Sequence, residues 1–213
     1  AFDAAKDIVF KPNSKYNLSA EDVKNICLNF ISGMMTEAAI YYNRTLTESD
    51  ILFFAHGGVE ASYMLKGGND ASVHAFIPKS SSRTNKRLEY MVRVLNKKSI
   101  QESQENIEQL LEAIWKKFLT GNGLLKNVTT KNGYEGYRVN TENIVLGPAA
   151  KWYICPKCKR VTPYNVADVC PSYMCDGILE PANIDELNKN NHYYRIYNEL
   201  KPSPLRVVEH TAQ

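Results

Sequence analysis

The sequence predicts an α+β fold, in which a mostly helical N-terminal part precedes a small module built on four cysteines. Two stretches, 20–42 and 102–119, place apolar residues at the three- and four-residue spacing of amphipathic helices. An Asn-Gly pair at 132–133 stands between short β-prone runs and indicates a hairpin. The four cysteines, which cluster in the last third of the chain, are Cys155, Cys158, Cys170 and Cys175.

The composition is that of an ordinary soluble globular protein, since 44% of the 213 residues are hydrophobic and 23% are charged. No apolar run reaches the roughly 18 residues that a membrane helix needs. The net charge of +3 is weak support for a nucleic-acid partner. Five cysteines are too few for a disulfide framework, so we expect a cytoplasmic protein without a membrane partner. Because neither end looks like a natural terminus, we interpret the chain as a fragment of a longer protein.

Residues 1–78 are predicted to form a helical region. Ser19 can cap a helix, and Asp22 stands three residues later, where it completes a capping box. The apolar spacing that follows predicts a helix up to about Tyr42. Cys27 lies on the apolar face of this helix, so we expect a buried core thiol rather than a fifth metal ligand.

Residues 79–98 form the basic part of the sequence, with seven lysines and arginines against one acid, Glu89. Treated as a helix, the segment places Lys86, Arg93 and Lys97 on one side and an apolar face on the other. The apolar face would pack on a core, and the basic face would bind the phosphates of a nucleic acid. A charged face that is merely solvated is the alternative interpretation. The predicted nucleic-acid contacts are Arg83, Lys86, Arg87, Arg93, Lys97 and Lys98.

The region 79–148 resembles a winged helix in the order of its predicted elements. The helix over 102–119 ends near a Gly-Asn-Gly sequence at 121–123, and the hairpin follows. A β-prone run at 144–146 predicts a further strand. Winged helices often bind DNA, but many serve only as protein–protein modules, so the fold leaves both functions open.

The cysteines form the pairs C-P-K-C and C-P-S-Y-M-C in a predicted zinc-ribbon-like module over 149–183. Two close pairs joined by a short loop can surround one tetrahedral zinc ion. Four thiolates would close the coordination shell, so the predicted zinc is structural and not catalytic. Gly177, two residues after the last cysteine, would permit a tight turn there. A redox C-x-x-C pair, or thiols that bind no metal, are the alternatives.

Aromatic residues flank the cysteines on both sides. Trp152 and Tyr153 could stack on a base, although packing beneath the metal site is the better interpretation of Trp152. After the module, residues 184–213 read as a connector that leads into a further domain. Within it, the tyrosine-rich segment 192–197 is predicted as a short helix or an extended connector, and 205–210 as a strand.

Motifs for catalysis are absent from the sequence. It contains no G-x-x-x-x-G-K-[ST] phosphate loop, no G-x-S-x-G nucleophile elbow and no H-E-x-x-H zinc motif. The four histidines show neither metal spacing nor triad spacing. We therefore expect this region not to be catalytic by itself.

A resemblance to a known family rests on strings in the C-terminal third: W-Y-I-C-P-K-C-K-R-V-T, V-C-P-S-Y-M-C-D-G-I-L-E, N-H-Y-Y-R-I-Y and L-R-V-V-E-H-T-A-Q. They are similar to large bacterial DEAD/DEAH-type helicases of superfamily two, some of which belong to phage-defence systems such as DISARM and Druantia. In that family a cysteine-rich insert lies between two RecA-like motor domains. A stretch like His192 to Tyr197 follows the insert, and a stretch like Glu209 to Gln213 opens the second motor.

The resemblance implies an accessory region of an ATP-dependent DNA helicase or translocase. Its partners would be single- or double-stranded DNA, bound without sequence specificity, and the flanking RecA-like motors. ATP and magnesium would bind only in the parent protein, since the phosphate loop, the D-E-x-H box and the arginine motif are missing here. The alternative is a zinc-stabilised protein-interaction module, in which Tyr193, Tyr194 and Tyr197 bind a partner or the adjacent motor.

Overall fold

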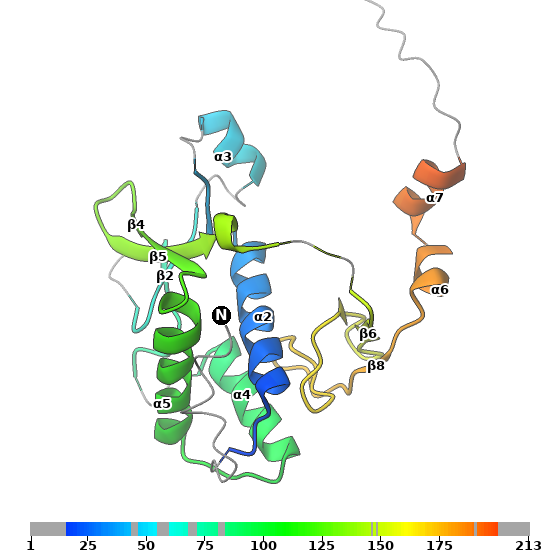
Figure 1. Cartoon of the computed structure of the whole chain (residues 1–213), viewed down its shortest axis with the longest axis horizontal. Helices are drawn as coiled ribbons and strands as arrows, with labels where there is room; N and C mark the ends of the chain where they lie inside the picture. The colour runs from blue at the N-terminus through cyan, green and yellow to red at the C-terminus, as the bar shows by residue number, and fades with distance from the viewer. Residues whose placement is uncertain are drawn as a thin grey trace, which may run out of the picture.

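The computed structural model shows a body of helices and β-sheet with the cysteine-bearing segment at its side (Figure 1). We call the described residues between 16 and 145 the body, and residues 151–182 the cysteine module. The mixture of helices and strands confirms the predicted α+β class. Within the described part of the chain, no helix is long and apolar enough to cross a membrane. The structure describes residues 16–43, 47–54, 60–67, 72–80, 84–145, 147, 149–189 and 191–199.

Helix α2 (Ala20–Thr36) begins as the sequence predicts. The Asp22 N–H donates to the Ser19 hydroxyl at 3.1 Å, and the Ser19 N–H donates to the Asp22 carboxylate at 2.9 Å. These two bonds complete the predicted capping box. Cys27 is fully buried on the apolar face of the helix, which confirms the predicted core thiol.

The predicted end of this helix near Tyr42 is wrong. Helix α2 stops at Thr36, and Ala38 takes a positive φ of 56°, which does not continue a right-handed helix. The chain then enters strand β1 (Ile40–Tyr41), which pairs with a central strand of the sheet. Pairing across the sheet replaces further helical turns here, although the residue spacing permits either.

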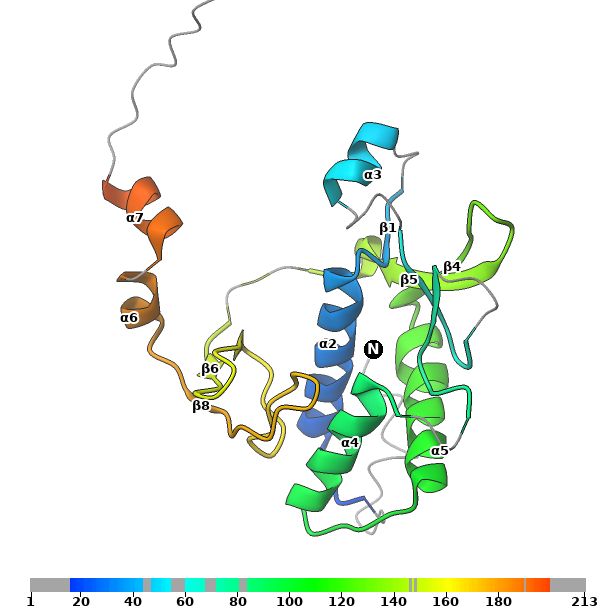
Figure 2. The same ribbon diagram turned by 180° about the vertical axis from the view of Figure 1, so that it is seen from behind.

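Helices α4 (Lys86–Lys97) and α5 (Gln104–Ile114) lie beside α2 in the body (Figure 2). The second long helix of the prediction becomes α5 followed by a π-helical stretch, η3 (Trp115–Thr120). Trp115 is buried there, with its ring centroid 4.8 Å from that of Phe76. The π-helical stretch therefore packs the end of the helix against the aromatic residues of the core.

A five-stranded sheet lies across one end of the helices (Figure 1). Its order is β1-β5-β2-β3, with β4 paired to β5, and the β4–β5 hairpin is the one predicted from the sequence, with Gly133 at a φ of 79° in the turn. The strand predicted at 144–146 is wrong for residues 144 and 145. The Asn140 side chain accepts from a backbone N–H and turns the chain into a 3₁₀ helix, η4 (Thr141–Asn143), before that point. The other strands are β2 (Ser62–Met64), β3 (Val73–Ala75), β4 (Leu125–Thr129) and β5 (Glu135–Asn140).

One hydrophobic core joins helices α2, α4 and α5 to strands β2 and β5. The rings of Phe30 and Phe76 meet edge-to-face in it, with centroids 5.5 Å apart. Because β2 pairs with β5, the sheet joins residues on both sides of the boundary predicted at residue 78. Helix α3 (Glu48–Phe54) lies beyond the sheet, away from the cysteine module (Figure 1).

The cysteine module is a small antiparallel sheet of the order β7-β6-β8, with two long loops. After it, α6 (Ile184–Lys189) and α7 (His192–Glu199) lead away from the body (Figure 1). Helix α7 confirms the helical alternative for the tyrosine-rich segment. The strand predicted at 205–210 lies outside the described residues. The strands of the module are β6 (Tyr153–Ile154), β7 (Val161–Thr162) and β8 (Glu180–Pro181).

Candidate metal centre and the basic helix beside it

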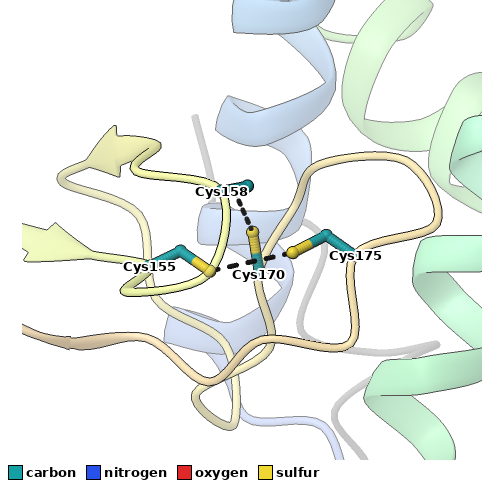
Figure 3. A group of neighbouring side chains, drawn as sticks. All are labelled: Cys155, Cys158, Cys170 and Cys175. Atoms are coloured by element: carbon teal, nitrogen blue, oxygen red, sulfur yellow. Dashed lines mark hydrogen bonds between the residues drawn. The ribbon is translucent and has the colours of Figure 1, made fainter.

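Four cysteine sulfurs point toward one another in the cysteine module (Figure 3). All four Sγ atoms lie within 4.8 Å of one another. The Sγ atoms of Cys155 and Cys175 are 3.7 Å apart, and those of Cys158 and Cys170 are 3.5 Å apart. This cluster, which the spacing predicts, could hold a metal ion such as zinc.

Hydrogen bonds around the exposed cysteine favour its thiolate form, whereas burial raises the pKa of the Cys170 and Cys175 thiols. Burial opposes the ionisation of Cys158, but the Ser172 hydroxyl and the Arg160 N–H outweigh it and lower the pKa of this thiol to about 6. The Ser172 Oγ atom lies 3.4 Å from the Cys158 sulfur. Donors of this kind also orient a sulfur that is bound to a metal.

Space, rather than backbone conformation, requires glycine at position 177. A Cβ atom at Gly177 would lie 2.4 Å from the Cys155 sulfur and 3.3 Å from the Cys175 sulfur. The glycine predicted to permit a tight turn thus lets the backbone approach the sulfurs closely. Any side chain at this position would push the two cysteines apart.

Arg93 of α4 ties the cysteine module to the body. Its Nη1 donates to the carbonyl oxygens of Cys170 and Cys175, both at 2.6 Å, and its Nη2 donates to the carbonyl of Ser172 at 3.0 Å. Glu89, one turn earlier in α4, holds the guanidinium with an Nε–Oε1 distance of 2.5 Å. The three carbonyls belong to the loop that carries two of the four cysteines, so α4 positions half of the sulfur cluster.

Two more of the basic residues predicted to contact nucleic acid form hydrogen bonds or ion pairs within the protein. Arg87 is 5% exposed, and its guanidinium donates to the carbonyls of Ala75 at 3.0 Å and Phe76 at 3.1 Å. Lys98 donates to the carboxylate of Asp22 at 2.9 Å. Both side chains therefore stabilise the body through their own hydrogen bonds.

The remaining predicted contacts differ in accessibility. Lys86 is half-buried and forms an ion pair with Glu37. Of the five predicted nucleic-acid contacts that the structure describes, Lys97 is the exposed one. Arg83, the sixth, lies outside the described residues. The basic face that was predicted to stay free is thus largely bonded to the protein itself.

The sequence contained a signal for both engaged arginines. Arg87, Met91 and Val94 follow the i, i+4, i+7 spacing of one helical face, so an arginine at 87 belongs to the buried side. Glu89 stands four residues before Arg93, which is the spacing of a helical ion pair. The charge of the segment, considered without these spacings, pointed to a free basic surface.

The Asp22 carboxylate makes a pH-dependent contribution to stability. Burial raises its pKa, but hydrogen bonds from Lys98 and Ser19 outweigh burial, so the pKa lies below its ordinary value of 3.8. The stabilising contacts are complete above about pH 4 and are lost as the pH falls through the lower pKa of the folded state. We expect Asp22→Asn to lower the free energy of unfolding at neutral pH by about 1 kcal/mol. Urea denaturation at a series of pH values from neutral to acidic measures how the free energy of unfolding falls with pH. This fall should be smaller in Asp22→Asn than in Glu21→Gln. An equal fall in the two variants would contradict the role given to Asp22.

The two aromatic residues before the first cysteine have different environments. Tyr153 packs against the buried cysteines of the module. Trp152 is half-buried and lines a groove of about 860 Å³ between the module and the first half of α2. Both residues line this groove, and Tyr153 also belongs to the packing around the sulfurs.

Comparisons with known proteins gave no match. No family model matches the chain, and neither a curated protein nor a solved structure does.

Proposed function

We propose that the chain is an accessory region of an ATP-dependent superfamily-two helicase or translocase, in which a structural zinc site supports nucleic-acid binding. The cluster of four sulfurs within 4.8 Å carries the proposal. Four thiolates saturate a tetrahedral zinc ion and leave no position for a reacting water, so the metal would organise the fold. ATP hydrolysis and magnesium binding would belong to the flanking RecA-like motors.

A zinc-ribbon-like role for the cysteine module is supported by its small core. Apart from three of the cysteines, the buried cluster around the sulfurs contains one residue, Leu179, with Tyr153 packed against it. Val166 and Val169 of the module are also buried, but they pack on the hydrophobic core of the body. So few apolar side chains do not stabilise a fold of this size without a further link. Bound zinc would supply that link by joining the turn after β6 to the loop before β8.

A winged-helix-like role for the body is supported by the order of its elements. Helices α4 and α5 precede the β4–β5 hairpin, which would be the wing. Strands β1 and β2 pair with β5 on its other side, so the hairpin is rooted in a larger sheet than a simple wing has.

Exposed lysines around the cysteine module would make the phosphate contacts. Lys97 on α4 and Lys151 and Lys159 in the module are all exposed, whereas Arg87 and Arg93 are bonded to backbone carbonyls. Contacts between lysines and phosphates carry no sequence information and weaken steeply with salt. Binding of this kind suits a region that holds DNA while a motor moves it.

A protein-interaction module is the second candidate, and helix α7 favours it. Tyr193 is 71% exposed and Tyr197 is 84% exposed on this helix. Tyrosines are enriched at protein interfaces, where the ring buries a large area and the hydroxyl stays hydrated. On this alternative the zinc site would be purely structural and α7 would bind the partner.

Titration of the zinc-loaded protein into labelled single- and double-stranded DNA across a salt series tests the nucleic-acid role. We expect a dissociation constant on the order of micromolar at low salt, with a steep loss of affinity as salt rises. Lys97→Glu combined with Lys159→Glu should weaken binding at least tenfold, since each exchange replaces a phosphate contact with a repulsion. Lys189→Glu, an exposed position on α6, serves as the matched control. The absence of binding at low salt would contradict this role and favour the interaction module.

A further inference from the structure

A cleft of about 250 Å³ lies where the cysteine module meets helices α2 and α4. Three cationic side chains line it, Lys86, Arg87 and Arg160, and Glu37 is the one acid among its lining residues. Glu37 pairs with Lys86, so the charges of the two arginines are not balanced within the lining. The guanidinium of Arg160 has no hydrogen bond to any other described residue. The electrostatics of the cleft therefore favour an anion.

Asn29, on the α2 side of the cleft, has a hydrogen-bond acceptor without a donor. Its side chain is 6% exposed, and its Nδ2 donates to the Tyr90 hydroxyl at 3.2 Å and to the Tyr164 carbonyl at 3.5 Å. Because a carbonyl oxygen can only accept, Tyr164 fixes the orientation of the amide. The Oδ1 atom then has no partner among the described residues. Because the Oδ1 atom is buried, a donor of a ligand would reach it only if the amide turned toward the cleft.

The walls of the cleft suit a planar ring. Phe30 and Tyr90 line it from the body, and Tyr173 lines it from the loop between Cys170 and Cys175. Tyr173 is 48% exposed, so one face of its ring is open to an occupant. The loop that places Tyr173 is also the loop that the metal centre would hold.

Gly33 keeps the floor of the cleft open. It stands inside helix α2, where glycine is a poor helix former, and it lines the cleft. A Cβ atom at this position would have no other atom within 4 Å. Packing inside the protein therefore does not require glycine here, and a large side chain at this position would enter the cleft.

We propose that this cleft binds one nucleotide. The base would lie against Tyr173, and the phosphate would lie at Arg160. The volume is below the roughly 300–1,000 Å³ of sites for drug-sized ligands, which limits the occupant to a single unit. The inference rests on the proposed nucleic-acid role, and it narrows that role to an unpaired nucleotide held between the zinc-bound loop and α2.

Binding of 5′-AMP, inorganic phosphate and a short single-stranded oligo(dA) to the zinc-loaded protein tests the proposal. NMR titration should show 5′-AMP shifting the side-chain amide resonances of Asn29, which lines the cleft, with an affinity at least tenfold higher than that of inorganic phosphate, since only the nucleotide carries a ring. If the oligonucleotide produces these shifts and free 5′-AMP does not, the source of the nucleotide is a strand. If both produce them, the cleft also accepts free nucleotides.

Two variants test the same site without disturbing the core. Arg160→Gln should weaken binding of the nucleotide about tenfold, as expected for the loss of one charge-assisted contact to phosphate. Gly33→Leu should block the cleft and abolish the Asn29 shifts, while the melting temperature stays equal or rises. Lys189→Gln makes the same charge change at an exposed position of α6, outside the lining, and should leave binding at this cleft within twofold of the original.

These experiments distinguish a failure of the proposed nucleic-acid role from a failure of the nucleotide site. If the unmodified protein binds no single strand at low salt, the proposed nucleic-acid role is wrong. If it binds the strand, and Arg160→Gln and Gly33→Leu bind equally well without Asn29 shifts, the strand lies elsewhere and the nucleotide site is overturned.

Discussion

Cys155→Ser is expected to release the metal and to unfold the cysteine module. A serine hydroxyl does not replace a thiolate in a tetrahedral zinc site, and Cys155 is fully buried among the other sulfurs. Binding of structural zinc contributes roughly 10–16 kcal/mol to folding in small zinc domains, which exceeds what the few apolar residues of this module supply. We expect zinc content to fall from one equivalent to near zero, and the backbone amides of 151–182 to lose their dispersed NMR resonances.

Cys27→Ser is the matched control, because it makes the same atomic change at a buried position in the body. Cys27 lies in helix α2 on the hydrophobic core, outside the sulfur cluster. Its replacement buries a hydroxyl and should lower the free energy of unfolding by about 1–3 kcal/mol, while zinc content stays at one equivalent. Full zinc content and unchanged melting of Cys155→Ser would refute the four-sulfur ligand set.

Local spacing in the sequence was enough to predict the helices and the sulfur cluster. The capping box at Ser19 and the apolar faces of α2 and α4 depend on residues three or four apart, and the cysteines meet because each pair spans a short turn. Such features depend on residues that are close together in the sequence. Their physical causes are therefore visible in short windows of sequence.

The sheet and the roles of the arginines depend on contacts between distant residues. Strand β1 has two residues and β2 has three, which is too short for an alternating pattern to show. Arg93 has the spacing of a surface residue, and only the position of the cysteine loop, 77 to 82 residues later in sequence, decides that its donors meet carbonyls. The nucleotide cleft depends in the same way on α2, α4 and the module coming together.

Arg93→Gln is expected to detach the loop from Cys170 to Cys175 from helix α4. The substitution removes three hydrogen bonds from a charged donor to the carbonyls of Cys170, Ser172 and Cys175, and it leaves Glu89 without its partner. Bonds to charged groups contribute about 1.5–3 kcal/mol each when they are protected from water, and the losses at one side chain are not additive, so we expect a total of about 3 kcal/mol. Lys97→Gln, one turn later on the same helix and exposed, should change stability by less than about 0.5 kcal/mol.

Amide hydrogen exchange distinguishes a detached cysteine loop from a general loss of stability. In Arg93→Gln the amides of the loop from Cys170 to Cys175 should exchange at least tenfold faster, while those in the core of α2 and α5 change less. Arg93→Lys should recover only part of the protection, because one ammonium group does not reproduce the planar fork that reaches three carbonyls. If the loop keeps its protection in Arg93→Gln, the arginine is not the anchor, and its guanidinium is available for the phosphate contact that the charge pattern predicts. If the protection is lost, any fall in DNA affinity on charge reversal at Arg93 reports a displaced zinc loop rather than a lost contact with DNA.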